Sequence, residues 1–343
     1  MKIGTVIDDI NARDSLKRGI LAEELGFESL WFTDHLIDTG GIKVDPWATM
    51  GAIASNTTTI NMCTCVTDTQ RIHPAKLAHI VGTLGELSEG RAWLGIGAGE
   101  AMNIVPFGMK FDDPKTRTER LAESIQVAKL LWGSSKASPV SFQGKHFELE
   151  NAWLDLEKLE PMPSVYVGAL GGRGALEVAG KYGDGWSSWL NSPETYRKKV
   201  GIAREAAKSS GKDPEKFEAC VWVYTLLTDK EEEIRGAVNR AKRGLLAEAF
   251  TLKMMGYDRP KELGKDTFQT MLVSQEVSQN ILKAQDSIPD KVALDCIAAG
   301  NRSKIIDRIE EFQEAGATRA MIHFLKNEDG QVREFSDQVL STF

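Results

Sequence analysis

The sequence predicts an α/β protein folded as a (β/α)8 TIM barrel, in which helices surround a closed ring of parallel strands. Short runs rich in β-forming residues alternate with helical patterns almost from one end of the chain to the other. This alternation is typical of βαβ units around a parallel sheet. The runs amount to about eight strands, and the 343 residues leave room for insertions, which favours a barrel over an open doubly wound sheet.

The first part of the chain gives four strands and their helices. Lys2 to Ile7 is expected to form the first strand, and an apolar stripe that stops at Gly26 marks the first helix. Pro74 suits the first turn of a later helix, where its missing N–H is not needed. The remaining elements predicted here are strands over 29–33, 60–66 and 91–96 and helices over 47–54, 74–87 and 117–132.

Two segments interrupt the alternation in the second part. Residues 133–160 are polar with short extended pieces, and residues 230–290 are helical and heavily charged, so both are predicted as insertions, after the fourth and seventh strands. The regular elements predicted around them are strands over 165–169, 185–189, 217–227 and 320–325 and helices ending near 180 and over 193–207, 305–312 and 332–339. Neither a linker nor an internal repeat is found, and residues 1–343 are predicted to form one domain.

Composition excludes several classes of protein. The 42 Lys and Arg residues against 49 Asp and Glu give a formal charge of −7, which argues against nucleic acid as a partner. No apolar run approaches the ~18 residues of a membrane span, and Asp8 interrupts the N-terminus before a signal-peptide core could form. We therefore expect a cytoplasmic protein with no membrane partner.

The four cysteines, Cys63, Cys65, Cys220 and Cys296, are interpreted as structural thiols of a reducing compartment. Cys63 and Cys65 lie in an expected strand, which points both side chains to one face. A metal would need two more ligands nearby, and no paired ligand motif accompanies the other cysteines. No metal site is predicted.

In a barrel of this kind the active site lies at the carboxyl ends of the strands. Asp34 and His35 end the second strand, where a carboxylate beside an imidazole can fix a tautomer and tune a proton donor or acceptor. Equally, Asp34 could cap a turn and His35 could be an ordinary surface or packed histidine. Spacing alone leaves both interpretations open.

Glycines follow the fourth and fifth strands. Gly95-Ile96-Gly97-Ala98-Gly99-Glu100 imitates a dinucleotide fingerprint, but Glu100 stands where the last glycine is required, so a nicotinamide Rossmann site is not expected. The glycines would let a flat ring or a phosphate approach the backbone. The turn from Gly168 to Gly174 opens a helix whose free N–H groups suit a phosphate. The alternatives are a tight strand exit and an ordinary βα turn.

Taken together, Thr33-Asp34-His35, Cys65-Val66-Thr67-Asp68, the segment 97–103 and the turn 171–175 resemble the bacterial-luciferase-like superfamily. They resemble more narrowly its coenzyme F420-dependent branch, which holds secondary alcohol dehydrogenase, glucose-6-phosphate dehydrogenase, phthiodiolone ketoreductase and methylenetetrahydromethanopterin reductase. The resemblance implies a TIM barrel, a homodimer, and a deazaflavin ring bound at the carboxyl ends of the strands. It also implies an F420-dependent dehydrogenase or reductase that acts on a small molecule.

The resemblance also assigns roles to residues. Asp34 would contact the ring, and Cys65-Val66 would be a non-prolyl cis peptide that forms a bulge behind it, followed by Asp68 where relatives often carry threonine or asparagine. His35 would handle the proton of a substrate hydroxyl, and Glu100 would be an acid or charge partner near the ring. The other expected cofactor-binding residues are Ala98, Gly99 and Asn103 along the ring and Gly171, Gly172, Gly174 and Ala175 at the phosphate and polar tail.

Departures from the family restrict the substrate. Trp189 stands where the glucose-6-phosphate enzymes hold the sugar phosphate with threonine, and no matching lysine follows, which disfavours that substrate. Val6 replaces the acidic residue of the methylenetetrahydromethanopterin reductases. An alcohol/carbonyl pair is the preferred substrate. The pterin reductase reaction stays open, because an iminium carbon accepts hydride without His35.

Two further alternatives differ in class. One is a luciferase-like monooxygenase that uses flavin mononucleotide (FMN), against which the segment 97–103 argues. The other is a non-catalytic barrel, against which the presence of both His35 and Glu100 argues. An apolar substrate pocket near the second insertion is a weaker hypothesis, since its candidate residues are also typical of core: Trp186, Trp189, Met254 and Met255.

Overall fold

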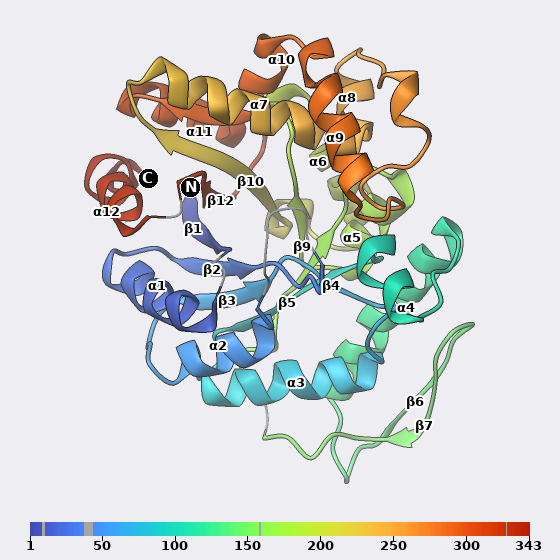
Figure 1. Cartoon of the computed structure of the whole chain (residues 1–343). Helices are drawn as coiled ribbons and strands as arrows, with labels where there is room; N and C mark the ends of the chain where they lie inside the picture. The colour runs from blue at the N-terminus through green and yellow to red at the C-terminus, as the bar shows by residue number, and fades with distance from the viewer. Residues whose placement is uncertain (9–10, 38–43, 158, 327) are drawn as a thin grey trace.

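The structure is a computed structural model that describes residues 1–8, 11–37, 44–157, 159–326 and 328–343. Its centre is a closed barrel of eight parallel strands, which confirms the predicted fold class (Figure 1). Neighbouring strands follow one another around the barrel, and the last strand pairs with the first. In this order they are β1 (Lys2–Ile7), β2 (Ser29–Phe32), β3 (Asn61–Thr64), β5 (Ala92–Gly97), β8 (Val165–Gly168), β9 (Gly185–Ser188), β10 (Glu218–Leu227) and β12 (Arg319–Phe324).

Two short strands extend this ring. β4 (Thr67–Asp68) continues the line of β3 and pairs with β5. β11 (Ile297–Gly300) pairs with the second half of β10 and was not among the predicted strands. Its sequence Ile-Ala-Ala-Gly contains few β-forming residues, so pairing with β10 rather than intrinsic preference defines it.

Helices cover the outside of the barrel (Figure 1). They are α1 (Ala12–Glu24), α2 (Pro46–Ala54), α3 (Pro74–Leu87), α4 (Pro114–Trp132), α5 (Arg173–Tyr182), α6 (Pro193–Ser209), α11 (Arg302–Glu314) and α12 (Asp329–Gln338). Several begin with a capping side chain followed by proline: Asp45 caps α2, Asp113 caps α4 and Ser192 caps α6. These caps explain why α4 begins at Pro114, before the predicted start near residue 117.

Both predicted insertions contain structure of their own. Between α4 and β8 the chain forms a small antiparallel hairpin, β6 (Val140–Gln143) with β7 (Glu148–Ala152), which projects from the body of the barrel (Figure 1). Between β10 and β11 lie α7 (Glu231–Glu248), α8 (Phe250–Met254), α9 (Gln275–Ala284) and α10 (Asp290–Leu294), grouped on one side of the barrel (Figure 1). The insertion boundaries and the single domain stay predictions.

A buried ionic cluster fills the amino end of the barrel. Arg319, at the start of β12, is 0% exposed and donates from Nη1 to Glu218 Oε2 at 2.8 Å and from Nη2 to Glu28 Oε1 at 3.0 Å. Its guanidinium also lies over the Trp93 ring, 4.5 Å from the centroid. A buried arginine needs such partners, since an unpaired charge is costly in the interior.

The free space of the barrel is therefore at the opposite, carboxyl end.

Among the described residues, no helix is both long and apolar enough to span a membrane. The same residues contain no grouping of three or more His, Cys, Asp or Glu suited to a metal ion.

Candidate active site

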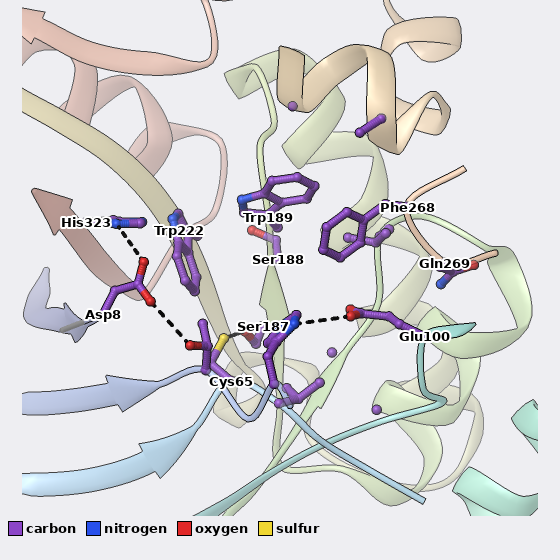
Figure 2. A pocket seen from close by; sticks show the side chains of 18 of the residues that line it. Asp8, Cys65, Glu100, Ser187, Ser188, Trp189, Trp222, Phe268, Gln269 and His323 are labelled. Atoms are coloured by element: carbon purple, nitrogen blue, oxygen red, sulfur yellow. Dashed lines mark hydrogen bonds and ion pairs between the residues drawn. The ribbon is translucent and has the colours of Figure 1, made fainter. Parts of the chain in front are cut away.

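A cavity of about 720 Å³ opens at the carboxyl ends of the strands. Its walls come from the ends of the barrel strands, from α7 and α9 and from the segment after α8. Figure 2 labels Phe268 and Gln269 of that segment. Most of the predicted site residues line it, namely His35, Glu100, Asp34, Cys65, Val66, Asp68, Ala98, Gly99 and Asn103. Parallel strands bring these distant segments to one edge, as the barrel prediction required.

Asn103 joins the second and fourth predicted strand ends. It lies in a 3₁₀ turn (Ala101–Asn103) and is 3% exposed. Its Oδ1 accepts hydrogen bonds from the backbone N–H groups of Leu36 at 2.7 Å and Ile37 at 2.8 Å. Backbone N–H groups can only donate, so these bonds fix the orientation of the amide. Its Nδ2 therefore points toward His35 and Glu100.

The orientation of this amide determines the tautomer of neutral His35. Asn103 Nδ2 donates to His35 Nδ1 at 3.0 Å, so Nδ1 is the acceptor and the ring hydrogen is on Nε2. The Glu100 carboxylate oxygen Oε2 is 3.6 Å from the same Nδ1 and 3.4 Å from Asn103 Nδ2. Figure 2 shows Glu100 extending across the cavity wall to make this contact. An added proton on Nδ1 would be stabilised by that carboxylate.

Asp34 is held by a cationic neighbour, Arg71, that is not evident from the sequence. Arg71 Nη2 lies 3.1 Å from Asp34 Oδ1 and donates to the Asp34 backbone oxygen at 2.7 Å, while Arg71 Nε pairs with Asp68. Burial lowers the pKa of Arg71, but Asp68 and Asp34 outweigh burial and raise it above its ordinary value. Thr67 also donates to Asp34 Oδ2 at 2.6 Å. Asp34 is thus a fixed carboxylate at the cavity wall.

Asp68 has a supporting geometry. Its Oδ1 accepts from the backbone N–H groups of Gln70 at 2.8 Å and Arg71 at 2.9 Å, and its other oxygen pairs with the Arg71 side chain. These contacts occupy both carboxylate oxygens and shape the loop after β4. Asp68 lines the cavity, and its contacts position the Arg71 side chain.

The back of the cavity is formed by the segment between β3 and β4. The peptide bond between Cys65 and Val66 is cis, as the resemblance implied. A Cβ on Gly97 would lie 2.5 Å from the Val66 side chain, and one on Gly168 would lie 2.8 Å from it. The two glycines therefore leave the space that Val66 fills.

Cys65 faces the cavity beside this bulge. Its Sγ lies 2.9 Å from Ser187 Oγ, a contact visible at the base of the cavity in Figure 2. Burial raises the pKa of the Cys65 thiol to about 12. The thiol is neutral at physiological pH, so a thiolate nucleophile is not available there.

The glycine turn after β8 lies beside the cavity rather than in its lining. None of its predicted residues, Gly171, Gly172, Gly174 and Ala175, lines the cavity, although Leu170 just before them does. Gly172 is the N-cap of α5, and no side chain in the described part of the chain caps this helix. Gly171 has φ +152, and a Cβ there would lie 2.5 Å from the Phe250 ring. The turn leaves the first N–H groups of α5 available to an anion.

Lys199 stabilises this turn through hydrogen bonds of its side chain. Its ammonium is buried and donates to Leu170 O, to Asn191 Oδ1 at 2.7 Å and to Thr251 Oγ1 at 2.8 Å. Burial lowers the pKa of Lys199 to about 8. This lysine connects the β8–α5 turn to α8.

Further residues of the cavity were missed from sequence. Asp8 follows β1, and its Oδ2 lies 3.6 Å from Nε2 of His323 in β12; Figure 2 shows this pair on the wall opposite Glu100. Arg240 and Arg243 enter from α7. Asp8 and His323 could have been found as polar residues at strand ends. The sequence of α7 does not indicate which side of that helix faces the cavity.

The weaker hypothesis of an apolar pocket is correct for one residue of four. Trp189 lines the cavity, 5.0 Å from the Phe268 ring, and its Nε1 donates to Tyr224 OH at 3.1 Å. Trp186 is 0% exposed and donates to Ala169 O, so it belongs to the core. Met254 and Met255 do not line the cavity.

Titratable side chains gather around a cavity at the carboxyl end of the barrel, which is where TIM-barrel enzymes have their active sites. The fold and the site therefore place the protein in the class of TIM-barrel enzymes. A sequence model described as luciferase-like monooxygenase matches residues 5–319, and the chain belongs to this family. The predicted superfamily is therefore confirmed.

Individual relatives narrow the comparison. The chain is 29% identical to an F420-dependent glucose-6-phosphate dehydrogenase of Amycolatopsis mediterranei, over 97% of this chain and 95% of that protein. It is 28% identical to a phthiodiolone/phenolphthiodiolone dimycocerosates ketoreductase of Mycobacterium tuberculosis, over 86% of this chain and 83% of that protein.

Solved structures share the fold. An F420-dependent secondary alcohol dehydrogenase in complex with an F420-acetone adduct aligns with a TM-score of 0.82 and 24% identity, over 100% of this chain and 99% of that one. The coenzyme F420-dependent tetrahydromethanopterin reductase from Methanopyrus kandleri aligns with a TM-score of 0.83 and 18% identity, over the same shares of the two chains.

Proposed function

We propose that this protein is a coenzyme F420-dependent oxidoreductase that transfers a hydride between carbon 5 of the deazaflavin and the carbon of an alcohol/carbonyl pair. The observation that carries the proposal is the arrangement of His35, whose ring is oriented by Asn103 beside the Glu100 carboxylate on the cavity wall. Relatives named as F420-dependent dehydrogenases support the cofactor.

The residues present fit a deazaflavin. Val66, backed by Gly97 and Gly168, offers a flat apolar surface for one face of a ring, and Asp34, Ala98, Gly99 and Asn103 would lie along its edge. The uncapped N-terminus of α5, with Gly171, Gly172, Gly174 and Ala175, would hold the phosphate and polar tail. Bound there, F420 would supply the hydride acceptor or donor at carbon 5.

The side chains of the chain itself handle the proton. When a carbonyl is reduced, its oxygen must gain a proton, and when an alcohol is oxidised, its hydroxyl must lose one. In the neutral tautomer that Asn103 favours, the Nε2 hydrogen of His35 can bond to the substrate oxygen but is not released, because its release would leave an imidazolate. Carbonyl reduction therefore needs the imidazolium, which would pass its Nε2 proton to the substrate oxygen and keep the hydrogen on Nδ1, beside Glu100. Alcohol oxidation would be the reverse, in which Nε2 of that second tautomer takes up the hydroxyl proton. When the imidazole is protonated, Glu100 stabilises the positive charge from 3.6 Å. His35 is thus the proposed catalytic acid and base, and Glu100 its charge partner.

The side chains that line the cavity restrict the class of substrate. Trp189 and Phe268 present aromatic rings to the body of a substrate, so an alcohol with an apolar body fits this wall better than the hydroxyl-rich ring of glucose 6-phosphate. The methylenetetrahydromethanopterin reductase reaction remains the second candidate, favoured by the Asp8 carboxylate near the end of β1. A homodimer and a cytoplasmic location also belong to the proposal and rest on the resemblance and the composition.

The first experiment is a fluorescence titration of the purified protein with oxidised F420 and, in parallel, with FMN. We expect F420 to bind and FMN to bind weakly or not at all. Binding of FMN alone would move the protein to the monooxygenases, and binding of neither would support the non-catalytic alternative.

The role of His35 is tested by His35→Ala in hydride-transfer assays with secondary alcohols and methylenetetrahydromethanopterin. Loss of a general acid and base should lower turnover ~100-fold while F420 affinity changes little. His79→Ala, on the exposed face of α3, is the matched control. Turnover of His35→Ala equal to that of the control would remove His35 from the mechanism.

A further inference from the structure

We propose that Arg240 and Arg243 form an anion-binding subsite in the cavity, and that the substrate carries a carboxylate or phosphate at the end of an apolar body. This inference rests on the function proposed above, because it concerns the substrate of the same cavity. It adds a specificity-determining site on α7, outside the strand ends that supply the proton-transferring groups.

The helix α7 presents a single stripe to the cavity. Arg240, Arg243, Gly244 and Ala247 are spaced as i, i+3, i+4 and i+7, and all of them line the cavity. A Cβ on Gly244 would lie 2.8 Å from Leu190 and 3.6 Å from Trp189, so the helix lies close against the aromatic wall. The two arginines are therefore placed next to the apolar part of the cavity.

Neither arginine has a carboxylate partner within 4.0 Å among the described residues. Arg243 Nη1 donates to the neutral amide oxygen of Gln285 at 3.0 Å, and Arg240 lies over the Tyr224 ring, 5.4 Å from the centroid. Lys242, on the same helix, has such a partner: its Nζ lies 2.6 Å from Asp290. The two arginines differ from Lys242 in facing the cavity.

Two like charges three residues apart on a helix repel each other. Burial, followed by the positive charge of Arg240, lowers the pKa of Arg243, although it stays protonated at physiological pH. An anion between the two guanidinium groups would turn this repulsion into attraction. Guanidinium groups bind carboxylates and phosphates through paired N–H bonds, which makes an oxyanion the matching ligand.

The cofactor tail is not the anion that this geometry favours. The turn at Gly172, where the tail is proposed to bind, does not line the cavity, whereas the arginines line it together with Trp189 and Phe268. Leu282 also lines it. A ligand that reaches from His35 to α7 would lay its apolar body on these side chains and its anionic end on the arginines.

The test measures binding of three probes to the F420-loaded enzyme by calorimetry: hexanoate, hexyl phosphate and 1-hexanol. We expect at least one anion to bind ten-fold or more tightly than the alcohol, and the preferred anion identifies a carboxylate or a phosphate subsite. Arg240→Gln combined with Arg243→Gln should abolish the preference and leave F420 affinity within two-fold. Arg235→Gln, on the same helix but outside the cavity lining, should change neither.

Several outcomes would overturn the inference. They are equal binding of the alcohol and both anions by the wild type, an unchanged preference in the double variant, and a loss of F420 affinity in that variant, which would assign the arginines to the cofactor tail. Arg240→Lys with Arg243→Lys keeps the charges and controls for folding; it should retain part of the preference. If the wild type fails to bind F420, the proposed function fails, whereas the probes still test the subsite on the free protein.

Discussion

Substitution of Asn103 separates two roles of one side chain. In Asn103→Ala the N–H groups of Leu36 and Ile37 lose their acceptor, and His35 loses the donor that orients it. Each lost hydrogen bond is worth roughly 1 kcal/mol, and a partly buried donor left without a partner costs more. We expect Asn103→Ala to lower the free energy of unfolding by about 2 to 3 kcal/mol.

Asn103→Asp is the matched variant. One carboxylate oxygen can still accept from Leu36 and Ile37, but the other lies where the amide donated to Glu100 Oε2 at 3.4 Å. Repulsion between the two carboxylates should therefore offset part of the retained stability. The other oxygen replaces the amide N–H beside His35 Nδ1, now 3.0 Å from an acceptor instead of a donor. The ring hydrogen should move to Nδ1, where the new carboxylate oxygen accepts it.

Two measurements check this reasoning. Urea denaturation gives the free energy of unfolding, and nitrogen NMR of the imidazole gives the tautomer. A loss below ~0.5 kcal/mol in Asn103→Ala would refute the energetic argument. An unchanged tautomer in Asn103→Asp would refute the orientation argument.

Three more predictions follow from the site. Gly97→Ala should push Val66 toward the cavity and weaken F420 binding ~10-fold. Val66→Ala in the same chain should restore only part of the affinity, because it relieves the clash but also removes the side chain proposed to support the ring. Titrations showing wild-type affinity for the single variant would contradict this. Alkylation of Cys65 should accelerate with rising pH and reach no plateau below pH 11, because its pKa is about 12; mass spectrometry showing an early plateau would count against it. Burial lowers the pKa of Lys199 from 10.5 in the unfolded chain to about 8, so between these pH values the unfolded state binds more protons than the folded state, and the free energy of unfolding should rise from pH 8 to 10.5. Lys199→Met should remove this rise. Denaturation measurements in which the free energy of unfolding depends on pH equally in both proteins would argue against it.

The barrel strands and the core of the site could be predicted because both follow from one rule. Parallel strands end at the same edge, so residues that follow them, such as His35 and Glu100, come together whatever their separation in sequence. The alternation of strands and helices was enough to find that edge. The short strand β11 was missed, since Ala298, Ala299 and Gly300 have little intrinsic preference for a strand.

Other parts of the site depend on tertiary packing. Arg71 pairs with Asp34 because the loop after β4 folds back toward β2, and the sequence of that loop gives no sign of it. The side of α7 that faces the cavity depends on how that helix packs over the barrel, which its own pattern of charges does not determine. The glycine turn at Gly172 was correctly placed after a strand, but the sequence could not tell that it lies outside the cavity lining.

The position of β12 has a consequence for synthesis of the chain. β12 pairs with β1 on one side and with β10 on the other, and its first residue, Arg319, binds Glu28 and Glu218 at the amino end. Until that segment leaves the ribosome, β1 and β10 each keep an open edge, and the two glutamates lack their cation. The barrel therefore cannot close before β12 has been synthesised and has left the ribosome, and until then the open edges of β1 and β10 are the part of the nascent chain that chaperones would have to shield.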